Sequence, residues 1–108
     1  MTTSTLEVYK GEALENITIL TKDSLSANVD VSWATTANST IEVKDKPGGT
    51  ILTTLTTTDI VSLGTVSAVV KGDKFYALDN GDYFAKFTAK DGTGRTKVLT
   101  FYLTVRDV

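Results

Sequence analysis

The stretch Asp79-Asn80-Gly81-Asp82-Tyr83-Phe84-Ala85 limits the fold more than any other part of the chain. It reads D-x-G-x-Y-x-A and leads directly into an alternating strand pattern. This is the spacing of a tyrosine corner, in which a Tyr near the start of a strand sends its hydroxyl back to backbone a few residues upstream. Such corners occur where two β-sheets pack face to face, so the stretch predicts a β-sandwich.

Short runs with apolar side chains at alternate positions fill most of the chain, which is the pattern of half-buried strands. Turn residues separate these runs, Pro47-Gly48 and Asp91-Gly92-Thr93-Gly94 most clearly. Residues 75–78 fit either a short strand or one helical turn. The pattern predicts an all-β, antiparallel sandwich of seven to nine strands, over residues 6–8, 17–21, 29–34, 40–54 as a hairpin, 60–63, 66–70, 83–89 and 96–105.

The chain of 108 residues has the size of one domain. We expect residues 1–5, which are rich in Thr, to form a flexible N-terminal arm and residues 6–108 to form the sandwich. The N-terminus has no signal-peptide pattern, which predicts a protein made in a cytosol and not secreted.

The composition argues against several functional classes. The chain has no Cys and no His, the residues that hold most zinc ions and that serve most often as nucleophile or base. Its net charge of -2 gives no electrostatic reason to bind nucleic acid or an anionic membrane. We therefore expect no enzymatic activity and no cofactor.

Trp33, Asp79, Gly81 and Tyr83 together resemble the structural motif of immunoglobulin-like domains, which bury a Trp on the third strand near the tyrosine corner. The family's disulfide is missing, because Ala85 stands two residues after Tyr83 and the second-strand region holds Ile17 and Ile19. The resemblance implies an immunoglobulin-like sandwich without a disulfide, with Trp33 and Tyr83 in or beside one core.

A cysteine-free, stand-alone domain of this type resembles the accessory proteins of phage virions. The segments Val8-Tyr9-Lys10-Gly11-Glu12 and Phe101-Tyr102-Leu103-Thr104-Val105 are also similar to the N-terminal attachment domain of siphophage upper baseplate proteins. The resemblance implies a structural protein of the virion, made in the host cytoplasm, most simply a capsid decoration protein whose partner is the major capsid protein or another virion protein. A tail, baseplate or fibre attachment domain and a glycan- or receptor-binding module are alternatives.

Asp73, Asp79 and Asp82 supply carboxylates near one another in sequence, which suggests a calcium site. Their spacing is not that of an EF-hand loop, and no Glu completes the set. Asp and Asn in such positions commonly bond to the backbone of turns, and we favour this interpretation.

Phe84, Val98 and Tyr102 are predicted to share the outer face of two adjacent strands, because their neighbours in sequence point inward. Three apolar side chains on one exposed face suggest a partner interface or homo-oligomerisation. Cross-strand pairing that only stabilises the sheet, or cover by the N-terminal residues, accounts for the same pattern.

Overall fold

The computed structural model describes residues 4–10, 16–23, 25 and 27–107. Within these residues it contains eight strands, one 3-10 turn and one helical turn. The elements are β1 (Ser4–Tyr9), β2 (Asn16–Leu20), η2 (Thr36–Asn38), β3 (Thr40–Lys44), β4 (Ile51–Leu55), β5 (Ile60–Leu63), β6 (Ser67–Lys71), α1 (Asp73–Tyr76), β7 (Gly81–Lys90) and β8 (Thr96–Arg106).

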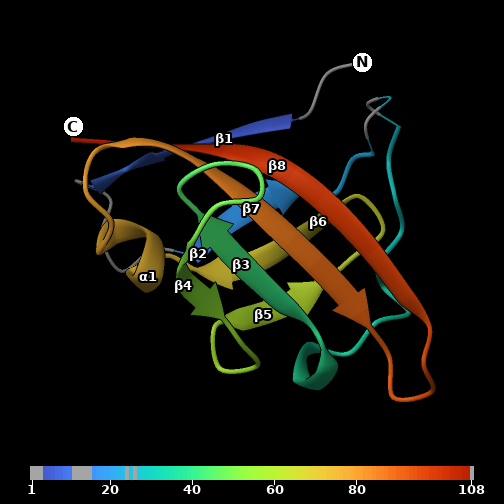
Figure 1. Cartoon of the computed structure of the whole chain (residues 1–108). Coiled ribbons are helices and arrows are strands. Elements are labelled where there is room, and N and C mark those ends of the chain that lie inside the picture. Colours follow the sequence, from blue (N-terminus) through green and yellow to red (C-terminus); the bar gives the residue numbers. More distant parts are fainter. Residues whose placement is uncertain (1–3, 11–15, 24, 26, 108) are drawn as a thin grey trace.

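The strands form two sheets, one in the order β1-β8-β7-β3-β4 and the other in the order β2-β6-β5. The long hairpin of β7 and β8 runs the length of the molecule (Figure 1). The pairs are antiparallel except that the edge strand β1 runs parallel to β8. The predicted all-β, immunoglobulin-like sandwich without a disulfide is thus confirmed, with this one parallel pair added.

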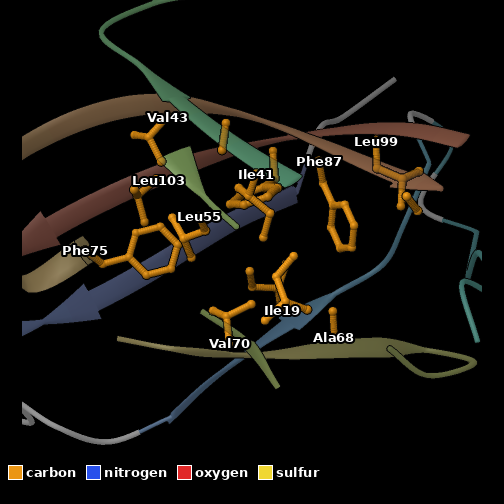
Figure 2. Close-up of a cluster of buried hydrophobic side chains, with 14 of the residues drawn as sticks. Ile19, Ile41, Val43, Leu55, Ala68, Val70, Phe75, Phe87, Leu99 and Leu103 are labelled. Atoms are coloured by element: carbon orange, nitrogen blue, oxygen red, sulfur yellow. The ribbon is translucent and has the colours of Figure 1, made fainter. Parts of the chain in front are cut away.

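Alternation along the strands places the hydrophobic core between the two sheets. Phe87, Leu99 and Leu103 point inward from the larger sheet, while Ile19 and Val70 meet them from the smaller one (Figure 2). All five are buried. Burying a side chain of this kind contributes about 2 kcal/mol relative to leaving it in water, so the paired faces are the main source of stability.

Residues 75–78, which fit either a strand or a helical turn, begin within the helical turn α1. Phe75 of α1 is fully buried in the core (Figure 2). The helical turn is closed by two backbone bonds, in which the amide N–H groups of Tyr76 and Ala77 donate to the carbonyls of Gly72 and Asp73. The described residues contain no helix long and apolar enough to cross a membrane.

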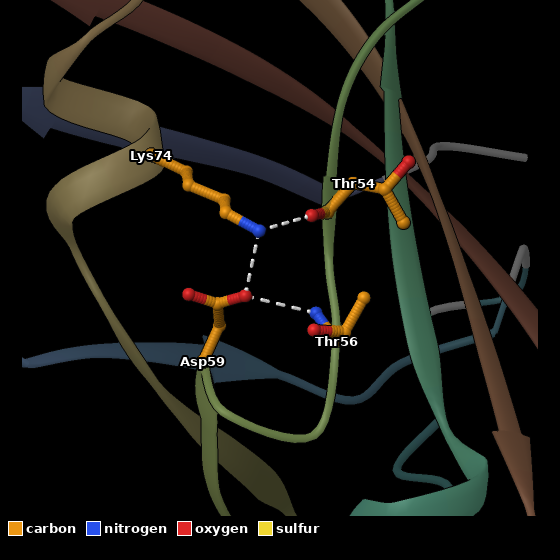
Figure 3. A network of polar contacts seen from close by, with 4 residues as sticks. All are labelled: Thr54, Thr56, Asp59 and Lys74. Carbon is orange, nitrogen blue, oxygen red and sulfur yellow. Dashed lines mark hydrogen bonds and ion pairs between the residues drawn. The ribbon is translucent and has the colours of Figure 1, made fainter.

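Lys74 of α1 joins the edges of the two sheets (Figure 3). Its Nζ donates to the Thr54 carbonyl of β4 at 2.6 Å and to Asp59 Oδ2 at 2.8 Å. The same carboxylate accepts the Thr56 amide N–H at 3.0 Å, just before β5 begins. The ion pair therefore connects the larger sheet, the helical turn and the entry to the smaller sheet.

The strand predicted over residues 29–34 is not present, and this part of the prediction is wrong. The segment is a connection that crosses between the sheets and turns at residues 32–34, where the Ala34 N–H donates to the Val31 carbonyl at 3.0 Å. Its other bonds are single ones, from Val29 N to Thr21 O, from Val31 N to Gly64 O and from Thr35 N to Lys90 O. Val31 is fully buried all the same. A segment whose alternate side chains are buried shows apolar residues at every second position, whether or not a neighbouring strand bonds to its backbone.

The N-terminal arm predicted over residues 1–5 is also wrong in part. The backbone of Ser4 and Thr5 pairs with Phe101 and Tyr102 of β8, so both residues belong to β1. Residues 1–3, and Gly11 and Glu12 of the baseplate-like segment, lie outside the described residues.

Candidate protein-binding face

The side of the five-stranded sheet that is turned away from the core carries the predicted interface residues, and we call it the outer face. Register pairs define it across the central strand β7 and its neighbour β8. Each pair has one residue from each strand: Asp82–Thr104, Phe84–Tyr102, Lys86–Thr100, Thr88–Val98 and Lys90–Thr96.

Phe84 and Tyr102 form one aromatic pair on this face. They stand directly opposite each other, and their ring centroids are 5.4 Å apart with the planes at 67°. This edge-to-face contact stabilises the sheet by about 1 kcal/mol. The pairing does not cover both rings, because Tyr102 keeps 45% of its surface exposed while Phe84 is half-buried.

A hollow of about 200 Å³ lies beside the aromatic pair. The turn between β3 and β4 forms one wall with Asp45, Lys46 and Pro47, while Asp82 and Tyr83 complete the lining with the two rings. Gly48 takes φ of 74° and Asp45 Oδ1 accepts the Thr50 amide N–H at 3.0 Å, which holds this turn in place. No sequence pattern predicts the hollow, because the hollow depends on how the turn lies against β7.

Val98 shares the outer face but does not touch the aromatic pair in the register of the sheet. The Lys86–Thr100 pair stands between Phe84–Tyr102 and Thr88–Val98. Val98 keeps 46% of its surface exposed. The predicted set thus consists of an aromatic pair and one aliphatic residue farther along β8.

Charged side chains that no sequence motif indicated also lie on the outer face. Asp82 is exposed at the corner end of β7, where its Oδ1 accepts the Thr104 hydroxyl at 2.9 Å. Lys90 is exposed at the opposite end of the same strand. Lys86 stands between them, opposite Glu42 of β3. Along β7 the outer face therefore carries an acidic residue at one end and basic residues at the middle and the other end. Lys44 of β3 lies opposite Phe84, so charges of both signs surround the aromatic pair.

The tyrosine corner has the predicted bond, since the Tyr83 hydroxyl donates to the Asp79 carbonyl at 2.6 Å. Burial raises the pKa of the Tyr83 phenol, and the negative charge of the Asp79 carboxylate raises it further. Gly81 begins β7 beside this bond. These residues hold the chain as it enters the sheet, which is a structural role.

Trp33 is not part of that corner. It lies half-buried in the turn of the connection between β2 and β3, and its Nε1–H donates to the Asp30 carbonyl at 2.8 Å. The Arg95 guanidinium covers its ring at 4.1 Å from the centroid. Arg95 follows the end of β7 that is opposite the corner, so the chain brings Trp33 to the far end of the sandwich.

The carboxylates of the described residues form no group of three or more acidic side chains that could hold a metal ion. The calcium hypothesis for Asp73, Asp79 and Asp82 therefore has no support in the geometry. The carboxyl pKa shifts of Asp30 and Asp91 are downward, mainly because hydrogen bonds within their turns favour the charged form. Such shifts mark turn carboxylates, whereas a general acid needs a raised pKa.

A scan against protein-family models finds no matching family, and a search of the curated proteins finds no match. One solved structure matches, the crystal structure of CopC from Methylosinus trichosporium OB3b, at 17% identity and a TM-score of 0.45. The match covers 84% of this chain and 95% of that chain. A likeness at this level carries no inference about what this chain binds.

The hypothesis of a phage virion protein is corrected by the three comparisons together, since none of them supports it. The comparison returns CopC and no capsid, tail, baseplate or fibre protein. Capsid decoration, and the attachment and glycan- or receptor-binding alternatives to it, are therefore not carried further. The expected virion location and capsid partner depended on that hypothesis, and we do not propose them either.

Proposed function

We propose that this domain is a non-catalytic module that binds another protein through its outer face. The observation that carries the proposal is the Phe84–Tyr102 pair, exposed at Tyr102 and adjoined by a hollow of about 200 Å³. Tyr is enriched at the centres of protein interfaces, where its ring is buried and its hydroxyl finds a partner.

The side chains around the aromatic pair suit a protein surface. Thr100 adjoins the aromatic pair on β8 and Thr88 lies one residue pair farther along β7, and Thr is stiff at χ1 because it is β-branched. Stiff side chains lose little conformational entropy when a partner covers them, which lowers the cost of binding. Because acidic and basic groups are both present, the face has no single-sign field of the kind that attracts nucleic acid.

The residues available for chemistry support a non-catalytic role. The sequence has no His or Cys, so a Ser or Thr nucleophile would lack the base that usually activates it. The one partly buried ion pair of the described residues, Lys74–Asp59, has structural partners at both ends. Its charges connect elements of the fold and are not directed toward the outer face.

A cysteine-free chain allows a single reactive site to be introduced at a chosen position. We would place one at Thr100→Cys, which is exposed on the outer face, and a matched one at Ser62→Cys, which is exposed on β5 of the other sheet. Each thiol carries a photoactivated crosslinker in an extract of the native source. We expect protein adducts from position 100 that disappear when Tyr102→Lys is added, and none from position 62.

Two outcomes would overturn the proposal. Equal adducts from both positions would mean that the crosslinker samples proteins by random collision. Adducts from position 100 that persist with Tyr102→Lys would mean that the aromatic pair has no part in binding.

A further inference from the structure

We infer that the partner at the outer face is a second copy of this chain, stacked face to face with its strands running in the opposite direction. The inference rests on the proposed function and names the partner for that same face. The two-fold axis would cross the strands at the Lys86–Thr100 pair, the midpoint of the outer face along β7 and β8.

The register of β7 and β8 makes this face self-complementary. One step from the midpoint, Phe84–Tyr102 lies on one side and Thr88–Val98 on the other. Two steps away, Asp82–Thr104 lies on one side and Lys90–Thr96 on the other. A half-turn about an axis that lies between the two faces and across the strands at the midpoint exchanges the two sides. Each residue then lies over the residue of the same strand that is equally far from the midpoint on the other side, in the second copy.

Apolar contacts follow from the half-turn. Tyr102 of one copy comes over Val98 of the other, and the contact occurs twice because the arrangement is symmetric. These two side chains keep 45% and 46% of their surface exposed in the single chain. Stacking thus covers the aromatic pair and the separate aliphatic residue in one step, although they do not touch within one chain.

Charge decides the direction of the stack. In the antiparallel arrangement, Asp82 at one end of β7 comes over Lys90 at the other end of β7 in the second copy. A parallel arrangement would bring each end over its own kind, Asp82 near Asp82 and Lys90 near Lys90, which opposes association. At the midpoint, Glu42 stands beside Lys86 within each chain. The half-turn brings Lys86 of one copy over Lys86 of the other, and the Glu42 beside each Lys86 offsets part of this repulsion.

Analytical ultracentrifugation of the whole chain over a range of concentrations tests the association. We expect a species of twice the 11.6 kDa chain mass. Tyr102→Lys should raise the dissociation constant at least about tenfold, equivalent to 1.4 kcal/mol. A chain that stays monomeric at every concentration, or a dimer that Tyr102→Lys does not weaken, would overturn the inference.

Charge exchange tests the direction of the stack. Asp82→Lys alone and Lys90→Glu alone should each weaken the dimer, because each places like charges together at both ends. The double variant should restore association, and an equimolar mixture of the two single variants should form mixed dimers. Loss of association in the double variant and in the mixture, with circular dichroism showing folded protein, would exclude the antiparallel stack.

A pair of cysteine variants tests the position of the axis. Thr100→Cys and Thr96→Cys are matched, because both positions are exposed Thr on the same face of β8. Residue 100 lies on the axis, whereas residue 96 lies about 14 Å from it, so two copies of residue 96 stand about 27 Å apart. A short bifunctional maleimide should join two chains through position 100 and not through position 96. Crosslinking through position 96 would overturn the inference.

These experiments separate the inference from the proposed function. A monomeric chain that still gives Tyr102-dependent adducts with another protein would exclude the second copy and retain a binding module. A chain that gives neither self-association nor adducts would overturn both.

Discussion

At the scale of single residues, the hydrogen bond of the tyrosine corner is the first feature to consider. The Tyr83 hydroxyl donates to the Asp79 carbonyl at 2.6 Å. The bond closes the turn that leads from α1 into β7, and the half-buried ring packs against the core. Because burial raises the pKa of the phenol, the neutral form that donates this bond is the one the fold favours.

Tyr83→Phe removes the bond and keeps the ring. We expect the free energy of unfolding at pH 7 to fall by about 1 kcal/mol, measured by urea denaturation. The raised pKa gives this contribution a direction with pH. It is complete below the pKa of an unfolded Tyr, near 10, and is lost as the pH rises through the higher folded value. The difference between wild type and variant should therefore shrink above about pH 10, and a constant difference would contradict this reasoning.

At the scale of secondary-structure elements, the turn that joins β7 to β8 depends on one Asp side chain and one Gly backbone conformation. Asp91 Oδ1 accepts the amide N–H groups of Thr93 and Arg95 at 2.9 and 3.0 Å, which holds the loop closed. Gly94 takes φ of 102°, which side-chain-bearing residues rarely adopt, while Gly92 in the same loop needs no positive φ. The two glycines therefore differ in function although their surroundings are similar.

Gly94→Ala should lower the free energy of unfolding by about 1 kcal/mol, because a Cβ disfavours positive φ even in open space. A Cβ on Gly94 meets nothing within 4 Å, so the cost is one of backbone conformation alone. Gly92→Ala is the matched control, since its Cβ would lie 3.9 Å from Asn38 Nδ2 and its backbone is unstrained. We expect that variant to stay within about 0.5 kcal/mol of wild type. Equal losses at both positions would show that the turn responds to volume and not to φ.

The strand pattern also shows where element prediction from sequence ends. The hairpin over residues 40–54 and the strands from residue 60 onward follow from alternation and turn residues. Alternation failed at residues 29–34, because Val31 is buried between the two sheets without pairing with a neighbouring strand, and the chain turns directly after it. Burial is a property of one side chain, whereas a β-strand needs a neighbouring strand to bond with. Only the presence of that neighbouring strand distinguishes a true strand from a buried connection with the same sequence pattern.

The whole molecule depends on two sheets staying together, and the Lys74–Asp59 pair joins their edges. Burial raises the pKa of the Asp59 carboxyl, but the hydrogen bonds from Lys74 and from the Thr56 amide outweigh this effect. The net shift is downward, so the folded state favours the carboxylate. The pair is partly exposed, which limits its contribution to stability.

A double-mutant cycle with Lys74→Met and Asp59→Asn should give a coupling of about 1 kcal/mol at pH 7. Because the folded pKa of Asp59 is lowered, its stabilisation is complete above the unfolded value, near 4, and is lost as the pH falls through the folded value. The coupling, measured by urea denaturation, should accordingly shrink as the pH falls below about 4. A coupling unchanged in acid would mean that the two residues interact through packing, and Lys74→Arg, which keeps the charge, should retain most of it at pH 7.

The sequence by itself determined the all-β sandwich, the tyrosine corner, the core positions of the last two strands and the exposure of Val98 and Tyr102. Each follows from local rules, since alternation and turn chemistry depend on residues near one another in the chain. Only the tertiary structure decided that β1 runs parallel to β8, that Trp33 meets Arg95 far from the corner, and that Phe84 and Tyr102 are paired while Val98 stands apart. These facts depend on strand register and on connections between the sheets, which bring together residues that are distant in sequence. A local sequence pattern holds no information about such long-range contacts.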